Sequence, residues 1–324
     1  MAIVNSVLGP INTEEMGITL MHEHIASLDM SMMHAYKDWC DMDETLDLFV
    51  KNVEAVKKYG VKTMVDPTPV NLGRDLQTMQ EGARRAGINI ICATGLYFME
   101  EPWIMRGTDV DCLASYFIRD LTEGIEGTDY KAGFIKVATD KYRGESEVNQ
   151  IMMLAAAKAS LVTGCPIMTH TQSKLKQGIY QQNIFLKAGV APHKIYIGHT
   201  FDCMDEEYIM FIMDKGSYVG ADQIGITHRN TTEQLANIIS NLIKKGKGYE
   251  KHIFLSHDAG AASDYAYSFS PFKRDASRNT SIRDYCELFV NLLPMLRQRG
   301  ITEEQINMMI IENPRRFFAG EPIK

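Results

Sequence analysis

Two histidines that flank a single glutamate, His22-Glu23-His24, are the sharpest chemical signal in this chain. They end an apolar run, and alternate side chains of a strand point to the same face. We therefore expect both imidazoles to face the interior of a sheet or barrel, with Glu23 directed outward to the helices. Two converging neutral imidazoles suit zinc, manganese or iron. The alternative is a hydrogen-bonded pair of core histidines without a metal.

Further potential metal ligands follow other apolar runs. His170 and His199 each end such a run, and so does Asp258. A carboxylate at this place can ligate a metal and accept a proton from bound water, so Asp258 is also the expected catalytic group. The competing interpretation of Asp258 is a helix N-cap, which aspartate favours. An N-cap does not explain its place beside the histidines, so the ligand role is preferred.

Lys136 lies inside the apolar sequence Gly133–Ala138. Lysine is almost never fully buried without a partner, and burial lowers its pKa because it disfavours the charged amine. A neutral amine can add carbon dioxide, and the resulting carbamate is an anion that can bridge two metals. The alternatives are a lysine paired with a carboxylate and a lysine that forms a Schiff base.

These residues lie in or at the ends of short apolar runs that alternate with amphipathic stretches. The runs are Gly17–His24, Val61–Thr68, Ile88–Tyr97, Gly133–Thr139, Pro166–Thr171, Lys194–Thr200, Ser217–Gln223 and His252–Asp258. The helical patterns include Asp43–Tyr59, Glu145–Val162, Glu233–Ile243, Ile282–Gln298 and Glu303–Phe318. Alternation of strand and helix predicts an α/β protein with a parallel sheet. Eight such units predict one domain over 1–324, a (β/α)8 TIM barrel with the metal site at the C-terminal ends of the strands. No GxGxxG follows the first run to indicate a dinucleotide-binding fold.

Composition narrows the partners and the compartment. The 324 residues carry a formal net charge of −7, which argues against nucleic acid or an anionic membrane as the main partner. The six cysteines are dispersed without a CxxC pair, as expected of reduced thiols. The sequence contains neither a signal-peptide pattern nor an apolar stretch of membrane-spanning length. We therefore expect a cytoplasmic protein.

Candidate substrate-binding residues are basic and aromatic side chains late in the chain. Lys244 follows the seventh run, and Arg278, Arg283 and Tyr285 follow the eighth. They could form a pocket for a phosphate or carboxylate on the substrate. For most of them the alternative is solvated surface charge. The segment Ser27–Asp41 either walls the pocket or belongs to a dimer interface.

The whole chain resembles the phosphotriesterase family of the amidohydrolase superfamily, especially its phosphotriesterase-like lactonases. The motifs that carry this resemblance are Gly9-Pro10-Ile11, Thr19–His24, Ala93–Tyr97, Gly198-His199-Thr200, Leu255–Asp258 and Glu312–Phe318. The resemblance implies two divalent metal ions, with zinc preferred and manganese, cobalt or iron as alternatives. It implies that His22, His24 and Asp258 bind the more buried metal, and that His170 and His199 bind the more exposed one.

The resemblance also implies that Lys136 is carboxylated and bridges the metals, and that Tyr97 positions the substrate near them. The alternative for Tyr97 is an aromatic side chain that closes the top of the barrel. A homodimer is the implied assembly. One departure is Asp222-Gln223, because relatives that act on acyl-homoserine lactones usually have arginine after this aspartate.

The expected activity is hydrolysis of a small-molecule lactone or ester. A hydroxide bridging two metals would attack a sugar lactone, phosphorylated or not, and Asp258 would pass the proton to the leaving oxygen. The alternatives with the same centre are a phosphotriesterase, an acyl-homoserine lactonase and another ester hydrolase. Two further hypotheses are a non-catalytic binding barrel, which would be favoured by a missing ligand, and an aldolase-type barrel, which needs Lys136 as a free amine.

Overall fold

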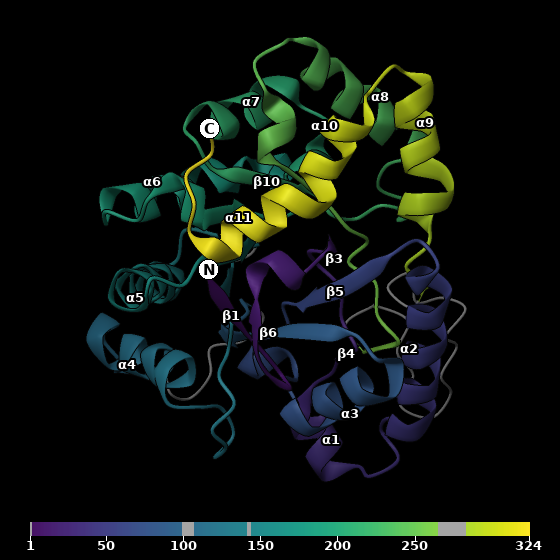
Figure 1. The fold of residues 1–324 in the computed structure, drawn as a ribbon. Coiled ribbons are helices and arrows are strands. Elements are labelled where there is room, and N and C mark those ends of the chain that lie inside the picture. Colours follow the sequence, from purple (N-terminus) through teal and green to yellow (C-terminus); the bar gives the residue numbers. More distant parts are fainter. Residues whose placement is uncertain (1, 99–106, 141–143, 265–282) are drawn as a thin grey trace.

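The computed structural model describes residues 2–98, 107–140, 144–264 and 283–324. Its centre is an eight-stranded parallel sheet in which strands that follow one another along the chain are neighbours, in the order β3-β5-β6-β7-β8-β9-β10-β11 (Figure 1). The strands are β3 (Ile18–Leu20), β5 (Val61–Asp66), β6 (Asn89–Gly95), β7 (Phe134–Ala138), β8 (Ile167–His170), β9 (Ile195–Ile197), β10 (Tyr218–Ala221) and β11 (Ile253–Leu255). Each lies inside one of the predicted runs, so the predicted TIM barrel is confirmed.

The barrel closes beyond the carboxyl ends of β3 and β11. There the main chain of His22 accepts a hydrogen bond from Asp258 N at 2.9 Å, and His24 N donates to Ala259 O at 2.7 Å. The short strands β4 (Ala26–Ser27) and β12 (Ala262–Ser263) continue this parallel pairing. Closure therefore places the first and last predicted ligands side by side, although they are far apart in the sequence.

Helices surround the strands, as Figure 1 shows. They are α1 (Met30–Ala35), α2 (Met42–Lys57), α3 (Leu76–Ala86), α4 (Val110–Thr122), α5 (Glu147–Thr163), α6 (Gln177–Lys187), α7 (Glu206–Asp214), α8 (Thr232–Lys244), α9 (Leu293–Gln298), α10 (Glu303–Asn307) and α11 (Asn313–Ala319). In α2, the side chain of Asp41 caps the first turn, and Leu46, Phe49 and Val53 form the buried stripe that faces the barrel. The helices predicted at Asp43–Tyr59, Glu145–Val162 and Glu233–Ile243 correspond to α2, α5 and α8.

Prolines alter the two helices at the C-terminal end. The helix predicted over Glu303–Phe318 consists of α10, a π-helical turn at Met308–Glu312, and α11. Pro314 lacks an N–H and its ring crowds the carbonyl four residues before it, which explains the wider turn there. The same arrangement precedes Pro294, where a π-helical turn leads into α9. This helical segment begins at Glu287, five residues after the predicted start at Ile282, which lies outside the described residues.

Aromatic side chains fill the amino end of the barrel. Tyr196, Tyr218 and Phe254 point into the barrel and pack against Phe317 of α11, with 5.5 Å between the ring centroids of Phe254 and Phe317. Figure 1 shows α10 and α11, in yellow, lying across this end beside β1 (Ile3–Ser6), which pairs with β2 (Gly9–Asn12). A plugged amino end leaves the carboxyl end for a polar site.

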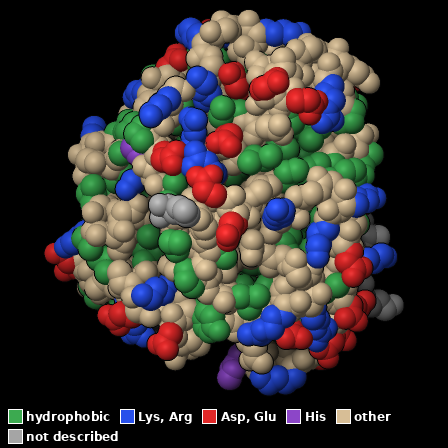
Figure 2. All heavy atoms as spheres, in the orientation of Figure 1, with side chains coloured by type: hydrophobic (Ala, Val, Ile, Leu, Met, Phe, Trp, Pro, Cys, Tyr) green, Lys and Arg blue, Asp and Glu red, His purple; other side chains and the backbone are tan. Residues whose placement is uncertain are grey.

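On the face drawn in Figure 2, lysine and arginine side chains are interspersed with aspartate and glutamate. Within the described ranges, no helix combines the length and the apolar character needed to span a bilayer.

Candidate metal centre

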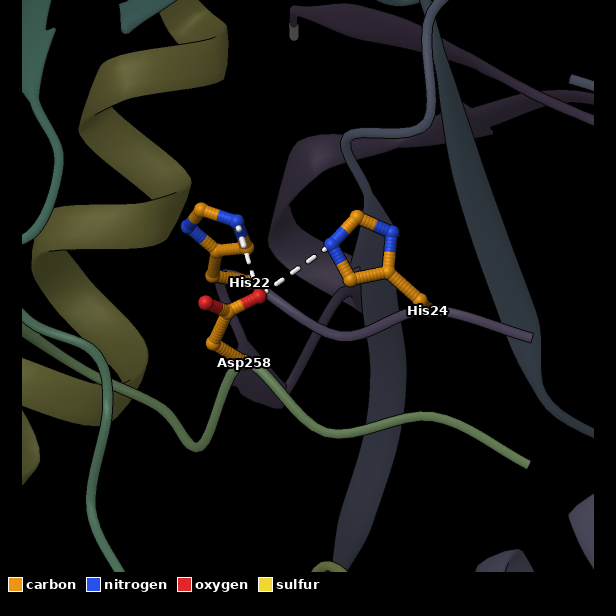
Figure 3. A group of neighbouring side chains, drawn as sticks. All are labelled: His22, His24 and Asp258. Atoms are coloured by element: carbon orange, nitrogen blue, oxygen red, sulfur yellow. Dashed lines mark ion pairs between the residues drawn. The ribbon is translucent and has the colours of Figure 1, made fainter. Parts of the chain in front are cut away.

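Three side chains from opposite ends of the chain converge where the barrel closes, beyond the carboxyl ends of β3 and β11. The Oδ1 atom of Asp258 lies 3.5 Å from His22 Nε2 and 3.2 Å from His24 Nε2. Figure 3 shows the Asp258 carboxylate directed toward both imidazoles. The three donor atoms are close enough to bind one cation together. Asp258 begins no helix but adopts a left-handed backbone with φ of 52°, so the N-cap interpretation is wrong.

The other two predicted histidines extend this group across the barrel mouth. His22 and His199 have ring centroids 4.9 Å apart, and His199 and His170 have centroids 4.6 Å apart. His199 Nε2 lies 3.8 Å from Asp258 Oδ2. All four histidines are buried. The structure therefore brings the four predicted histidines into one cluster, in which Asp258 lies beside His22, His24 and His199.

Asp222, directly after β10, orients two of these rings through their Nδ1 atoms. Its carboxylate lies 3.1 Å from His22 Nδ1 and 3.0 Å from His199 Nδ1, and it accepts the main-chain N–H of His199 at 2.9 Å. The charge of Asp222 thereby fixes a proton on each Nδ1 and leaves each Nε2 to face Asp258. His22, His199 and Asp222 also lie close enough to hold an ion by themselves. We interpret Asp222 as the partner of the ligands, because both Nδ1 atoms already donate to it.

Asp222 is itself held by Tyr196, whose hydroxyl donates to Asp222 Oδ2 at 2.5 Å. Both groups lie against the main chain of Gly220, where any Cβ would collide with the Asp222 carboxylate. A glycine at this position is therefore required for the close approach. In the sequence, Asp222 stands near the end of the run Ser217–Gln223, and this position was the available signal for a functional role.

His24 has its own partners at the end of β5. Its Nδ1 lies 2.6 Å from Thr68 Oγ1 and 3.6 Å from Asp66 Oδ1. Asp66 is in turn fixed by the main-chain N–H groups of Ile25 and Thr68. The Nε2 of His24 is thus directed to Asp258, in the same manner as that of His22.

Lys136 contributes a buried amine to the site. Its side chain is 1% exposed, and Nζ has no hydrogen-bond partner among the described residues. Burial lowers the pKa of this amine to about 8, against the attraction of Asp258, Asp222 and Asp66. Gly95 allows β6 to approach, since a Cβ there would collide with the carbonyl oxygen of Lys136. A buried amine without a partner fits the predicted carbamate, which would replace the amine with an anion facing the histidines.

Burial and neighbouring charges shift the pKa values of the histidines in opposite directions. Burial lowers the pKa of His22 to about 3 and that of His170 to about 4, so both are neutral donors. Burial also lowers the pKa of His24, but Asp258 and Asp66 outweigh it and raise the value to about 9. His24 Nε2 and Asp258 Oδ1, 3.2 Å apart, then form a buried pair of opposite charges.

Glu23 does not join the ligands. Its carboxylate accepts hydrogen bonds from Ser256 Oγ at 2.8 Å, His257 Nδ1 at 2.7 Å and the main-chain N–H of Ala259 at 3.0 Å. His257 Nε2 then accepts the N–H of Leu288 at 3.1 Å. Glu23 therefore fastens the segment that carries Asp258 to the C-terminal helical region.

Tyr97, at the end of the third predicted run, reaches His170. Its hydroxyl lies 3.0 Å from His170 Nδ1. The main chain of Tyr97 is clamped by Asn71, whose amide donates to Tyr97 O at 2.8 Å and accepts from Tyr97 N at 2.6 Å. Asp140 Oδ2 lies 3.4 Å from the other ring nitrogen of His170. Tyr97 therefore lies beside His170, at the edge of the candidate metal centre.

Among the described members of the predicted substrate-binding set, Lys244 lies apart from Arg283 and Tyr285. Lys244 is the exposed last residue of α8. Barrel helices run back toward the amino ends of the strands, so Lys244 lies on the opposite side from the histidines. This position does not favour a substrate contact by Lys244, which stays a prediction. Arg278 lies outside the described residues.

Arg283 and Tyr285 contact the main chain of the segments that carry predicted ligands. Arg283 donates to the carbonyl oxygens of Ile224 at 2.5 Å and Asp258 at 3.2 Å, and also to that of His257. Tyr285 is fully buried, and its hydroxyl donates to His24 O at 3.1 Å. These contacts are those of residues that position the ligand-bearing main chain, and the predicted substrate contact of both residues stays a prediction.

The segment Ser27–Asp41 is tied to the residues after β11. Asp264 Oδ2 accepts hydrogen bonds from Trp39 Nε1 and from the main-chain N–H of Asp29, both at 2.8 Å. The segment contains α1, none of whose residues is buried. It therefore lies along the rim of the barrel on the side of β11.

Comparison with known proteins agrees with this geometry. The model of the phosphotriesterase family matches residues 2–318. An aryldialkylphosphatase of Saccharolobus solfataricus is 34% identical over 95% of this chain and 97% of the relative. A phospho-furanose lactonase of Mycoplasmopsis agalactiae is 29% identical over 98% of this chain and 91% of the relative. The structure of the phosphotriesterase from Mycobacterium tuberculosis has a TM-score of 0.89 and 31% identity, with 98% of each chain covered. From the barrel, the converging ligands and these matches, we conclude that the chain belongs to the phosphotriesterase family.

Proposed function

We propose that this protein is a binuclear metal-dependent lactonase that opens sugar lactones to hydroxy acids. The observation that carries the proposal is the convergence of His22 Nε2 and His24 Nε2 on Asp258, next to the buried and unpartnered amine of Lys136. A barrel core without a function would not be expected to contain this arrangement, because the burial of each of these polar groups is unfavourable.

The donor set fits two cations. His22, His24 and Asp258 would hold one metal, and His170 and His199 would hold the second. Lys136, as a carbamate, would bridge them. When bound, the metals supply a Lewis acid for the carbonyl and lower the pKa of water. We propose zinc, with manganese, cobalt or iron as alternatives that the same nitrogen and oxygen donors accept.

Asp258 is the proposed proton carrier. It stands at the centre of the site, and its carboxylate is partly exposed, unlike the fully buried Asp222. It would accept the proton of the attacking water and give it to the ring oxygen as the ester bond breaks, which yields one hydroxyl and one carboxylate on the same product. Tyr97 would orient the substrate from the side of His170.

The names of the relatives support two substrate classes. The phospho-furanose lactonase supports a sugar lactone, and the aryldialkylphosphatase supports a phosphotriester as the second candidate. We propose the lactone, and we retain Arg278 as the proposed anchor for a phosphate group. A homodimer and a cytoplasmic location stay predictions, which sedimentation and cell fractionation can test.

The test is hydrolysis of a substrate panel, followed by proton release. The panel contains aldonolactones with and without a phosphate, an acyl-homoserine lactone and a neutral aryl phosphotriester. We expect the metal-loaded protein to open aldonolactones fastest, and we expect chelation to abolish and zinc to restore the activity. Asp258→Asn should lose most of it. Activity that survives chelation would refute the proposal, and faster hydrolysis of the phosphotriester would select the second candidate.

A further inference from the structure

Gln223 touches the proposed proton carrier. Its Nε2 donates to Asp258 Oδ2 at 2.6 Å, and the residue is 6% exposed. The other half of the same amide, Oε1, is buried and has no hydrogen-bond partner in the part of the chain that the structure describes. Among the buried side-chain atoms without a partner, Gln223 Oε1 and Lys136 Nζ belong to residues that face the Asp258 carboxylate.

The orientation of this amide is determined by chemistry. An ionised Asp258 can only accept hydrogen bonds, so the Gln223 amide presents its nitrogen to Asp258, and its oxygen is the neighbouring atom of the same planar group. Arg283 links the segment that carries Gln223 to the segment that carries Asp258, because it donates to the carbonyl oxygens of Ile224 and Asp258. The unpartnered oxygen is therefore held beside Asp258 by contacts on both segments.

A buried acceptor without a donor is unfavourable, and at a binding site the donor can come from the ligand. Asp258 serves the reacting ester group, so a donor that reaches Gln223 Oε1 belongs to an atom close to that group. A hydroxyl on the carbon next to the lactone carbonyl meets this condition. A neutral phosphotriester and an unsubstituted lactone carry no such donor.

We propose that Gln223 determines specificity by accepting a hydrogen bond from a hydroxyl next to the carbonyl of the substrate. The inference rests on the proposed lactonase function and deepens it. Gln223 then selects α-hydroxylated lactones, such as aldonolactones, over apolar lactones and over phosphotriesters.

The test compares three lactones that differ in one group. They are γ-butyrolactone, its 2-hydroxy derivative and its 2-methoxy derivative, which keeps the oxygen but loses the donor. Each kcat/KM is divided by the rate of alkaline hydrolysis of the same lactone, so that intrinsic reactivity cancels. We expect the wild type to prefer the hydroxy over the methoxy and parent lactones by roughly 10-fold, the effect of about one hydrogen bond. Equal normalised values in the wild type would overturn the proposal.

Variants isolate the acceptor. Gln223→Arg retains a donor toward Asp258 but has no acceptor, and Gln223→Met has neither. The preference for the hydroxy lactone should fall to about unity in both, whatever their absolute rates. Gln172→Met is the matched control, since Gln172 contacts Asp140 and not Asp258. A preference that persists in Gln223→Arg would contradict the role of the acceptor.

A binding measurement keeps this inference separate from the proposed function. The lactam analogues of the hydroxy and parent lactones have the same shape but resist hydrolysis. Calorimetry on the metal-loaded wild type should show roughly 10-fold tighter binding of the hydroxy lactam, and Gln223→Met should remove the difference. Absence of any lactone hydrolysis would refute the proposed function, whereas equal lactam affinities would refute the role of Gln223.

Discussion

Replacing Asp222 with asparagine should weaken metal binding without removing a ligand. One oxygen of Asp222 receives both the main-chain N–H and Nδ1 of His199, and the other receives Nδ1 of His22 and the hydroxyl of Tyr196. An asparagine has one acceptor oxygen, so its NH2 group must face one of these two pairs of donors. One histidine therefore loses the acceptor that fixes its tautomer.

The expected loss follows from that single interaction. A hydrogen bond to a charged partner contributes about 1.5–3 kcal/mol, and loss of an outer partner of a metal ligand lowers affinity roughly 10- to 100-fold. Competition between the protein and a chromophoric chelator measures this affinity directly. Asp120→Asn is the control, because Asp120 pairs with Arg74 at 2.7 Å away from the histidines. It should lower stability but not metal affinity. An Asp222→Asn protein with the metal affinity of the wild type would refute the reasoning.

Three further outcomes follow from other contacts. Glu23→Gln should lower the free energy of unfolding in urea by about 1–3 kcal/mol, because a neutral amide cannot replace the carboxylate that accepts from Ser256 and His257; an unchanged midpoint would contradict this. Burial lowers the pKa of His252 below 6.5, so the unfolded chain binds more protons under that pH and stability falls as the pH falls through 6.5. His252→Gln should therefore lose less stability than the wild type between about pH 7 and pH 5, and parallel curves would show that His252 is not responsible. Asn71→Ala should lower kcat roughly 10-fold in the wild type but have little effect in Tyr97→Phe, because Asn71 acts through Tyr97; additive losses would indicate a separate role.

The barrel and the ligand positions could be predicted because they depend on local pattern. Parallel strands buried on both faces need short, continuous apolar runs, and all eight strands lie within such runs. Donor residues at the ends of these runs must meet, since parallel strands share one carboxyl end. The sequence alone therefore groups His170, His199 and Asp258 with His22 and His24.

Side-chain partners could not be predicted in this way, because they depend on which strands become neighbours and how closely the backbones approach. Asp222 serves two histidines only because β9 and β10 are adjacent and the barrel closes beside β3. Lys244 follows a strand that carries site residues, yet the return of α8 places it at the far end of the barrel. The sequence by itself determined which groups could bind metal, because their spacing matches the strands. Only the tertiary structure decided which groups orient those ligands and which residues lie too far away, because these depend on distances across the barrel.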